Sequence, residues 1–417
     1  MGIELDERYQ TEAYEQVKSD FESGNKSCVV FPTGCGKSYI ALKMIEDNPE
    51  KEIVYVSSSS VINAQIRNII KETYGEEAKK KFPKLKFYTY NALRRLDSEE
   101  LAKLNPEMIV LDELHRAGAP VWGKGVQKLL ERKPNAKVLG LTATPVRTDG
   151  RNMAEEICGG ISYELPLTEA VARGVLPVPE YICSEYIFEE DIQRVEELIE
   201  QIDDEQIKEE YREKVEIARK HIENADGLEK VFGKRMEKKN GKYILFSKDI
   251  ADIDTKADKV TEWFKEVNPN VTISKISSAN EREENIEELS FFRNNSDETL
   301  KVAVAVNMLN EGYHDEELNG VIMTRRTMSE ILFRQQLGRA LSRDGKYTPQ
   351  IFDLVNNIRY FENFRREVTE IIKRGLSRGK EKNGYSKDII DRFRIIEEQI
   401  DFIDEFKQIE KTWTARI

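Results

Sequence analysis

A candidate phosphate-binding loop spans residues 31–38, which read Phe-Pro-Thr-Gly-Cys-Gly-Lys-Ser. Gly34 and Gly36 can adopt positive φ and carry no Cβ, so the backbone can curl around a pyrophosphate with its N–H groups pointing inward. Lys37 supplies a positive charge that can reach the outer phosphates, and the Ser38 hydroxyl is placed to ligate Mg²⁺. The residue types in this loop therefore predict binding of a nucleoside polyphosphate.

The sequence on either side of the loop supports this interpretation. Residues 27–30 are an apolar, strand-like run, and residues 39–45 have a helical pattern. A strand, a glycine loop and a helix in that order put the positive end of the helix dipole beneath the bound anion. The general pattern G-x-x-x-x-G-K-[ST] has glycine where this chain has Phe31, however. A chance Gly-rich turn is therefore the alternative, and a second motif is needed.

A pair of carboxylates provides that second motif. Residues 108–111 are four consecutive apolar residues, typical of a buried parallel strand, and Asp112 and Glu113 follow them. The carboxyl ends of such strands line the ligand crevice of an open α/β sheet. In that position Asp112 would hold Mg²⁺ and Glu113 would polarise the attacking water. The two motifs together predict an ATPase core.

These two motifs resemble those of the superfamily 2 helicases. Asp-Glu-x-His at residues 112–115 resembles the DExH box, and Pro-Thr-Gly-x-Gly-Lys-Ser at residues 32–38 resembles a form of the family's first motif. The resemblance implies ATP and Mg²⁺ as cofactors and nucleic acid as the partner. It adds Thr33 and Cys35 to the loop residues that bind ATP, and it assigns His115 to the coupling of hydrolysis to movement.

Further motifs of the family occur in its order along the first half of the chain. Gln10, which follows Arg8 and Tyr9, resembles the adenine-reading glutamine of the family's Arg-x-Tyr-Gln-like stretch. Ser57 and Ser58 begin a serine run that resembles a motif binding the sugar-phosphate chain, although a Ser-rich helix N-cap explains the run equally well. Thr89 resembles a residue of the family's next motif that contacts the nucleic-acid strand. Thr-Ala-Thr-Pro at residues 142–145 resembles the motif that links hydrolysis to movement of a second domain, through Thr142 and Thr144.

The second half of the chain carries the later motifs. Phe246 and Ser247 end an apolar run and resemble motif IV, which implies contact with nucleic acid. Gly312 resembles the glycine of motif V, where the backbone approaches nucleic acid or ATP closely. Many family members have Asp or Asn two residues after that glycine, where this chain has His314 and then Asp315. Which of these two would contact ATP or ribose is open.

A helix predicted from residue 330 onward resembles motif VI. It contains Gln335, Gln336 and Arg339, with Arg343 after them. The resemblance implies that an arginine from here stabilises charge on the γ-phosphate, an effect worth on the order of 10³ to 10⁵ in rate at related sites. In the common spacing Q-x-x-G-R-x-x-R the last arginine would fall on Ser342, so either Arg339 or Arg343 is the candidate finger.

Alternating strands and helices indicate an α/β fold with two RecA-like, doubly wound parallel-sheet domains, a helical insertion and a C-terminal helical extension. We expect residues 1–175 to form RecA-like domain 1, which binds ATP, and residues 176–365 to form RecA-like domain 2. Apolar residues at helical spacing predict the insertion at about residues 189–238. Residues 366–417 are expected to form a basic linker, over 373–387, and then a helix over 389–409.

Composition limits the classes of protein and partner. The net charge of −12 argues against coating nucleic acid through bulk charge, although a local basic groove is compatible with it. The four cysteines form no C-x-x-C pair and there are three histidines, so neither zinc nor a disulfide framework is predicted. No apolar run reaches the ~20 residues of a membrane helix and no targeting signal is evident, so we expect a cytoplasmic protein, with a monomer favoured.

The function predicted from the resemblance is an ATP-dependent helicase or translocase. Gly-Arg-Ala-Leu at residues 338–341 and Glu-Gly at residues 311–312 resemble the XPB and type III restriction helicase groups, which favours DNA over RNA. The contacts implied with nucleic acid are those of Ser57, Ser58, Thr89, Phe246 and Ser247. Two alternatives are an RNA-directed helicase and a nucleotide-gated scaffold subunit that binds a protein partner through its insertion or C-terminal helix.

Overall fold

The computed structural model describes residues 2–121, 123–147, 149–184, 196–197, 199–202, 204–224, 228–247, 251–265, 267–277, 280, 282–294, 298–306, 315, 317–325, 329–342 and 347–398. It divides into two compact units. The first unit comprises Met1–Leu176 and Val368–Lys387, and the second comprises Pro177–Glu367 and the described part of Asp388–Ile417. The sequence predicts a domain boundary after residue 175, and the two units divide after Leu176. The segment expected to follow the second domain, residues 366–417, is shared between the two units.

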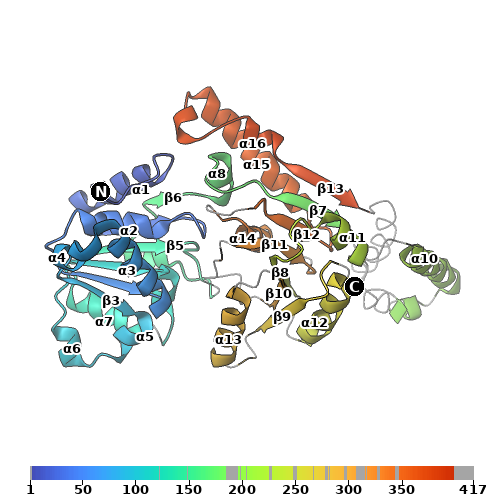
Figure 1. Ribbon diagram of the computed structural model, residues 1–417, viewed down its shortest axis with the longest axis horizontal. Coiled ribbons are helices and arrows are strands. Elements are labelled where there is room, and N and C mark those ends of the chain that lie inside the picture. The colour runs from blue at the N-terminus through green and yellow to red at the C-terminus, as the bar shows by residue number, and fades with distance from the viewer. Residues whose placement is uncertain are drawn as a thin grey trace. The chain divides into compact units, whose positions relative to one another are not determined.

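The first unit is built on a six-stranded sheet in the order β3-β2-β4-β5-β1-β6 (Figure 1). Every pairing between neighbouring strands in it is parallel. The carboxyl ends of its strands therefore meet at one edge of the sheet, which brings residues 31–38, the acidic pair and Thr142 to that edge. The strands are β1 (Lys26–Val30), β2 (Ile53–Ser57), β3 (Leu85–Thr89), β4 (Met108–Asp112), β5 (Lys137–Thr142) and β6 (Tyr163–Glu164).

Helices cover both faces of this sheet. Figure 1 shows α1 and α2 on one face and α5 and α7 on the other. Val30, Val54 and Leu111 point toward the second of these faces, where they pack with Leu93 of α5 and Val126 of α7 in one buried apolar cluster. The helices are α1 (Gln10–Ser23), α2 (Lys37–Glu46), α3 (Ser60–Tyr74), η1 (Gly75–Glu77), α4 (Ala78–Lys81), α5 (Tyr90–Arg95), α6 (Ser98–Ala102), η2 (Leu114–Gly118), α7 (Lys124–Arg132), η3 (Ala154–Cys158) and α8 (Leu167–Ala172).

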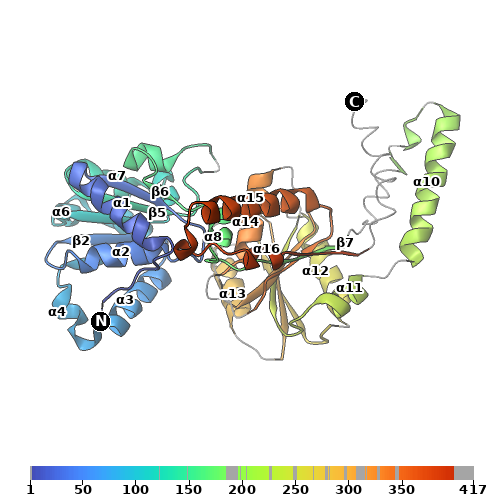
Figure 2. The same cartoon turned by 90° about the horizontal axis from the view of Figure 1, so that it is seen from above.

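The second unit contains a seven-stranded sheet in the order β13-β7-β12-β11-β8-β10-β9, again with parallel pairings throughout. The two all-parallel sheets confirm the α/β fold class predicted from the sequence. Figure 2 gives a second view of the elements. The strands are β7 (Glu180–Ser184), β8 (Lys242–Phe246), β9 (Val271–Ile276), β10 (Leu300–Ala305), β11 (Leu318–Met323), β12 (Gln350–Asp353) and β13 (Arg394–Glu398).

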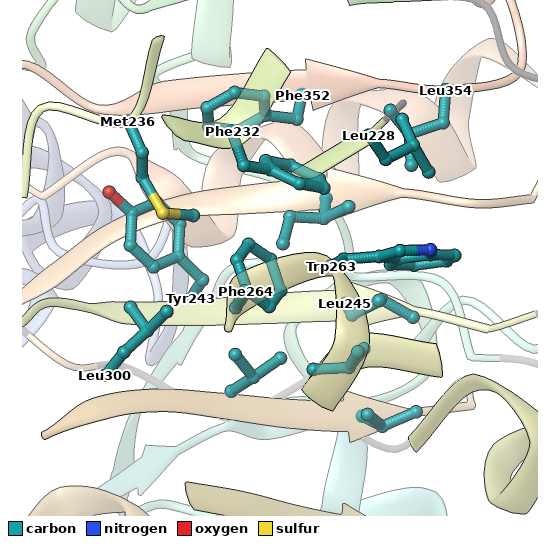
Figure 3. Close-up of a cluster of buried hydrophobic side chains, with 14 of the residues drawn as sticks. Leu228, Phe232, Met236, Tyr243, Leu245, Trp263, Phe264, Leu300, Phe352 and Leu354 are labelled. Carbon is teal, nitrogen blue, oxygen red and sulfur yellow. The ribbon is translucent and has the colours of Figure 1, made fainter. Parts of the chain in front are cut away.

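Among the described residues after β7, the helices are α10 (Glu205–Asn224), α11 (Leu228–Arg235), α12 (Ala251–Phe264), α13 (Arg282–Arg293), α14 (Glu330–Ala340), α15 (Ile358–Ser377), η5 (Glu381–Asn383) and α16 (Asp388–Asp391). Helices α10 and α11 fall within the range expected for the insertion. The ring of Phe232 on α11 lies 4.5 Å from that of Phe264 on α12 and 5.0 Å from that of Phe352 on β12, between centroids. Figure 3 shows these side chains in one apolar cluster, so α11 is part of the core of the second unit.

The C-terminal part corrects two expectations. The helix expected over residues 389–409 is wrong at 394–398, which form β13 and pair in parallel with β7; residues 399–409 lie outside the described residues. Ile395 and Ile396 are β-branched and suit an edge strand, so sheet pairing overrides the helical spacing. The linker expected over 373–387 is also wrong in part, because α15 continues to Ser377 and Tyr385 is buried.

Strand β7 directly follows Pro177 and Pro179. In the part of the chain that the structure describes, no helix combines the length and apolar character needed to cross a membrane.

Candidate active site

The loop at residues 31–38 has the backbone that its glycines predict. Gly34 and Gly36 have φ of 82° and 68°, in the region that side chains with a Cβ rarely adopt. Helix α2 begins at Lys37, directly after Gly36. Phe31, where the general motif has glycine, is fully buried, and its ring lies 5.3 Å from that of Tyr9 between centroids. The Phe31 side chain therefore packs in the core, and its presence in place of glycine leaves the turn at Gly34 and Gly36 intact.

Asp112 lies buried at the end of β4. Its carboxylate accepts hydrogen bonds from the Tyr55 hydroxyl, at 3.2 Å, and from the Glu113 backbone N–H, at 3.1 Å. Burial, and next the negative charge of Glu113, raise the pKa of Asp112 to about 6. A divalent cation would favour the ionised carboxylate, because opposite charge stabilises the charged form.

Tyr55 is a site residue that sequence reasoning missed. Its hydroxyl donates to the carboxylate of Asp112 and interacts with the side chain of Ser38; Asp112 and Ser38 are the two predicted Mg²⁺ ligands. The side chain is fully buried at the centre of β2. Burial, followed by the charge of Asp112, raises the pKa of Tyr55 well above its usual value, so the phenol keeps its proton and donates it. A lone tyrosine inside the apolar strand 53–56 was the available signal.

Glu113 is held between two basic groups on a strained backbone. Its Oε1 lies 3.9 Å from Lys37 Nζ, and its Oε2 lies 3.4 Å from His115 Nδ1. Its φ is 54°, a left-handed conformation that is costly for a residue with a side chain. The surrounding contacts therefore fix this carboxylate beside the end of the phosphate loop.

The two threonines of the Thr-Ala-Thr-Pro motif continue the chain of contacts. His115 Nδ1 lies 3.3 Å from Thr142 Oγ1. The Thr142 hydroxyl donates to the Thr144 carbonyl at 2.8 Å and accepts from the Thr144 backbone N–H at 3.2 Å. The structure thus brings Lys37, Glu113, His115, Thr142 and Thr144 into one continuous polar path.

Gln10 also reaches the loop. Its Nε2 lies 3.3 Å from the Cys35 carbonyl and 3.2 Å from the Gly36 carbonyl, and its Oε1 accepts from the Asp6 backbone N–H at 2.8 Å. Tyr9, which precedes it, donates its hydroxyl to the Cys35 carbonyl at 2.7 Å. The side chain predicted to read adenine therefore supports the phosphate loop as well. Thr33, on the same loop, is half-buried.

In the first unit, the residues predicted to bind nucleic acid lie at or next to strand ends. The side chains of two of them form hydrogen bonds with nearby residues of the chain. Ser57 is fully buried, with its hydroxyl 2.8 Å from Asn63 Oδ1. Thr89 accepts from the Ala92 N–H at 3.0 Å and caps α5. Ser59 caps α3, which is the alternative reading of the serine run, and Ser58 is half-buried.

In the second unit the predicted residues are mostly buried. Phe246 and Ser247 are 1% and 2% exposed, and the Phe246 carbonyl accepts a hydrogen bond from the Thr324 hydroxyl at 2.9 Å. On α14, Gln336 and Arg339 are buried, and Gln335 is half-buried. Among the described residues, Gln336 Oε1 is a buried atom with no hydrogen-bond partner. Gly312, His314 and Arg343 lie outside the described residues.

Ser38 and Asp112 fit a magnesium ion. A hydroxyl and a carboxylate are the hard oxygen ligands that Mg²⁺ takes, and this ion is usually held by one or two protein carboxylates together with substrate phosphates. The described residues contain no group of three or more His, Cys, Asp or Glu side chains arranged as a metal site.

Comparison with known families matches both halves of the chain. Residues 5–147 match the family described as type III restriction enzyme, res subunit. Residues 223–343 match the family described as helicase conserved C-terminal domain. A protein called helicase 22 in Sulfolobus islandicus filamentous virus (isolate Iceland/Hveragerdi) is 26% identical over 378 residues, which cover 84% of this chain and 64% of the viral protein.

Solved structures share the fold. The ATP-dependent type ISP restriction-modification enzyme LlaBIII, bound to DNA, superposes with a TM-score of 0.51 at 17% identity, covering 98% of this chain and 32% of that one. Dbp5 from S. cerevisiae, bound to RNA and ADP BeF3, gives a TM-score of 0.50 at 12% identity, covering 97% of this chain and 92% of that one. At these identities the likeness shows the architecture alone. This chain spans less than two thirds of the length of the viral relative and about a third of the restriction enzyme.

Proposed function

Because the chain belongs to the superfamily 2 helicases, in their type III restriction-like group, we propose that it hydrolyses ATP and uses the energy to move along or unwind DNA. The observation that carries the proposal is the polar path from Lys37 through Glu113 and His115 to Thr142. This path joins the phosphate loop, the acidic pair and the coupling motif, and all of it lies within the first unit.

The chain's own groups take distinct roles in this proposal. The loop N–H groups and Lys37 bind the triphosphate, and Ser38 and Asp112 hold Mg²⁺. When bound, Mg²⁺ withdraws charge from the phosphate oxygens and orients them. Glu113 accepts the proton of the attacking water, and its strained backbone and its contact with Lys37 hold the carboxylate in place for that transfer.

Gln10 would recognise the base, and its amide can donate to and accept from adenine. Thr33, Gly34, Cys35 and Gly36 supply the rest of the ATP-binding loop. Arg339 or Arg343 would place positive charge on the γ-phosphate, which stabilises the charge that develops during transfer.

Several residues are assigned to coupling and to the nucleic acid by the same family resemblance. His115 and Thr142 would transmit a change in the contacts of Glu113 to the end of β5 and to Thr144, because His115 lies in hydrogen-bond contact with Thr142 and Thr142 with Thr144. In the second unit, Gln335 and Gln336 on α14 would take part in coupling ATP hydrolysis to movement. Backbone groups at Ser57, Ser58, Thr89, Phe246 and Ser247 are the proposed contacts with the strand, since the Ser57 and Phe246 side chains are buried.

DNA is the proposed substrate class. Its support is the likeness to the type III restriction group and the fold shared with a restriction-modification enzyme bound to DNA. An RNA-directed helicase is the competing function, since Dbp5 bound to RNA has the same architecture.

The test is ATP hydrolysis by the purified chain without nucleic acid and with single-stranded DNA, duplex DNA, single-stranded RNA or duplex RNA. The assay is run at low and moderate salt, because phosphate contacts weaken steeply as salt rises. Stimulation by DNA and not by RNA supports the proposal, and stimulation by RNA alone assigns the competing function. Hydrolysis that none of these polymers changes, and that Lys37→Ala abolishes, would indicate a nucleotide-gated scaffold.

A further inference from the structure

A turn near the C-terminal end of the chain packs against the segment that carries Gln10. This turn, residues 381–385, is called the return turn below; it consists of η5, Gly384 and Tyr385 and belongs to the first unit. Asn383 Nδ2 donates to Glu12 Oε1 on α1 at 2.9 Å, between residues 371 positions apart in the sequence. Tyr385 is only 6% exposed. The turn is therefore a packed part of the first unit.

Arg173 links the return turn to α1. Its Nε donates to the Tyr385 hydroxyl at 3.0 Å and to Glu169 Oε1 at 2.8 Å, and Tyr385 and Glu169 also hydrogen-bond each other. Its Nη1 donates to the Arg8 carbonyl at 2.6 Å and to Glu12 Oε2 at 3.1 Å. The guanidinium is buried and bonded on both sides, so the geometry of the turn and that of α1 depend on each other.

Gly384 brings the backbone of the turn into direct contact with the same segment. Its φ is +91°, and a Cβ at this position would lie 2.2 Å from the Arg173 carbonyl oxygen and 2.9 Å from Arg8 Cδ. Only glycine permits this approach, because no real Cβ makes contacts below about 3.0 Å. Arg8 in turn donates to the Gly174 carbonyl at 2.6 Å.

A short path leads from Arg8 to the phosphate loop. Arg8 Nε donates to Asp6 Oδ1 at 3.0 Å, and the Asp6 backbone N–H donates to Gln10 Oε1 at 2.8 Å. Gln10 Nε2 then donates to the Gly36 carbonyl at 3.2 Å. The contacts of the return turn with Arg173 and Arg8 therefore bear on the orientation of the Gln10 amide.

We propose that the return turn is a positioning element for recognition of the nucleotide base, with Arg173, Gly384 and Tyr385 as its positioning residues. It fixes the backbone of residues 6–10, and thereby the Gln10 amide that distinguishes adenine from other bases. This inference rests on the proposed function, in which Gln10 binds the base of ATP. The contacts traced from the turn lead to Gln10 and reach the phosphate loop only through the Gly36 carbonyl, so we expect the turn to act on ATP binding more than on the chemical step.

The test compares two Gly→Ala variants of the full chain. Gly384→Ala places a Cβ against Arg173 and Arg8, whereas Gly379→Ala has the same kind of positive φ, +65°, with nothing within 4 Å. Both variants carry the backbone strain, and only Gly384→Ala displaces the turn. We expect Gly384→Ala to raise KM for ATP about tenfold relative to Gly379→Ala and to lower the ratio of kcat/KM for ATP over GTP, with kcat within about twofold.

Tyr385→Phe gives a milder test if Gly384→Ala does not fold. It keeps the ring, which packs against Gly375, and removes the hydroxyl bonds to Arg173 and Glu169. The same selectivity loss, at smaller size, supports the proposal. Unchanged KM and unchanged ATP over GTP preference in folded Tyr385→Phe and Gly384→Ala would overturn it.

Direct titration with fluorescent ATP and GTP analogues separates this inference from the proposed function. If the chain binds ATP but Lys37→Ala leaves hydrolysis unchanged, the proposed function fails. If Lys37→Ala abolishes hydrolysis while the return-turn variants bind both analogues like the parent protein, only the positioning role fails.

Discussion

The two sheets are both parallel, yet their carboxyl edges differ in chemistry. In the first unit that edge carries Asp112, Glu113 and Thr142. Glu113 and Thr142 contact the phosphate loop, through Lys37 and the Phe31 N–H, and Asp112 accepts from the Glu113 backbone N–H. In the second unit β8, β10, β11 and β12 end in Phe246, Ala305, Met323 and Asp353. The residues that end these four strands include one carboxylate, that of Asp353.

Asp353 and Asp112 are both buried acids at strand ends, but their surroundings are unlike. Asp353 accepts hydrogen bonds from the Tyr181 hydroxyl at 2.6 Å and from the Val355 N–H at 3.2 Å, and also from the Asn357 N–H at the start of α15. Asp112 instead adjoins a second carboxylate, and burial together with the charge of Glu113 raises its pKa to about 6. A buried acid surrounded by donors indicates a structural cap, whereas a buried acid beside another acid is typical of a reactive site.

The largest effect on ATP hydrolysis is expected from a substitution in the acidic pair of the first unit. Glu113→Gln should lower kcat for ATP by about 10² to 10⁴, because it removes the proton acceptor and keeps the shape of the side chain. ATP should still bind, whereas Lys37→Ala should lose both binding and turnover. Steady-state hydrolysis and titration with a fluorescent ATP analogue check both variants. Normal turnover in either variant would contradict the assignment of Lys37 and Glu113 to ATP hydrolysis.

Tyr55→Phe tests whether the hydroxyl between Ser38 and Asp112 organises the magnesium ligands. We expect the Mg²⁺ concentration for half-maximal hydrolysis to rise by about 10- to 100-fold, as is usual when a ligand loses its supporting partner. Tyr90→Phe is the matched control. Its hydroxyl is also buried but donates to the Asp112 backbone carbonyl, at 3.0 Å, and not to the carboxylate.

If Tyr55→Phe and Tyr90→Phe change the Mg²⁺ requirement equally, the role of Tyr55 is general packing. A change confined to Tyr55→Phe supports a specific link to the metal ligands.

Asp353→Asn tests the contrasting assignment in the second unit. Replacing a buried charged acceptor of several hydrogen bonds should cost roughly 1.5–3 kcal/mol of stability. For a domain of this size that corresponds to a fall in Tm of about 2–4 °C per kcal/mol. KM for ATP should not change. Thermal unfolding and ATP titration measure the two quantities, and a raised KM with unchanged Tm would contradict a structural cap.

The sequence predicted that the loop at residues 31–38 and the acidic pair lie at one edge of a parallel sheet, because both directly follow strands. Lys37 and Asp112 follow apolar runs that could form parallel strands, and parallel strands end at one edge. The strain at Glu113 and the link through Tyr55 could not be predicted, because they depend on how neighbouring strands are registered. Tyr55 pairs with Val110 on β4, which sets its hydroxyl near the end of that strand.

The C-terminal part was predicted least well, because long-range contacts decide its structure. Residues 394–398 have helical spacing and form a strand, since an open edge at β7 is available to pair with. Gly384 and Tyr385 lie in a basic, glycine-containing stretch that reads as a linker. Their packing depends on Arg173, more than 200 residues earlier, for which the sequence carries no local signal.

The smallest expected effect concerns pH and the first unit alone. Burial would raise the pKa of Glu12, but hydrogen bonds from Tyr163 and Arg173, with the charges of Arg173 and Lys380, lower it below its ordinary 4.5 in the folded protein. The unfolded chain then binds more protons as the pH falls, so the stabilisation is complete above pH 4.5 and is lost as the pH falls through the folded pKa.

Glu12→Gln should therefore lower Tm relative to the parent protein at about pH 6, and the difference should shrink toward about pH 4. The shift is expected to be small, because the carboxylate is 40% exposed and solvent screens its ion pair with Arg173. Asn383 donates to the same carboxylate, so the pH dependence should weaken in Asn383→Ala. A Tm difference that stays constant between these pH values would show that Glu12 contributes as a packed polar group and not through its charge.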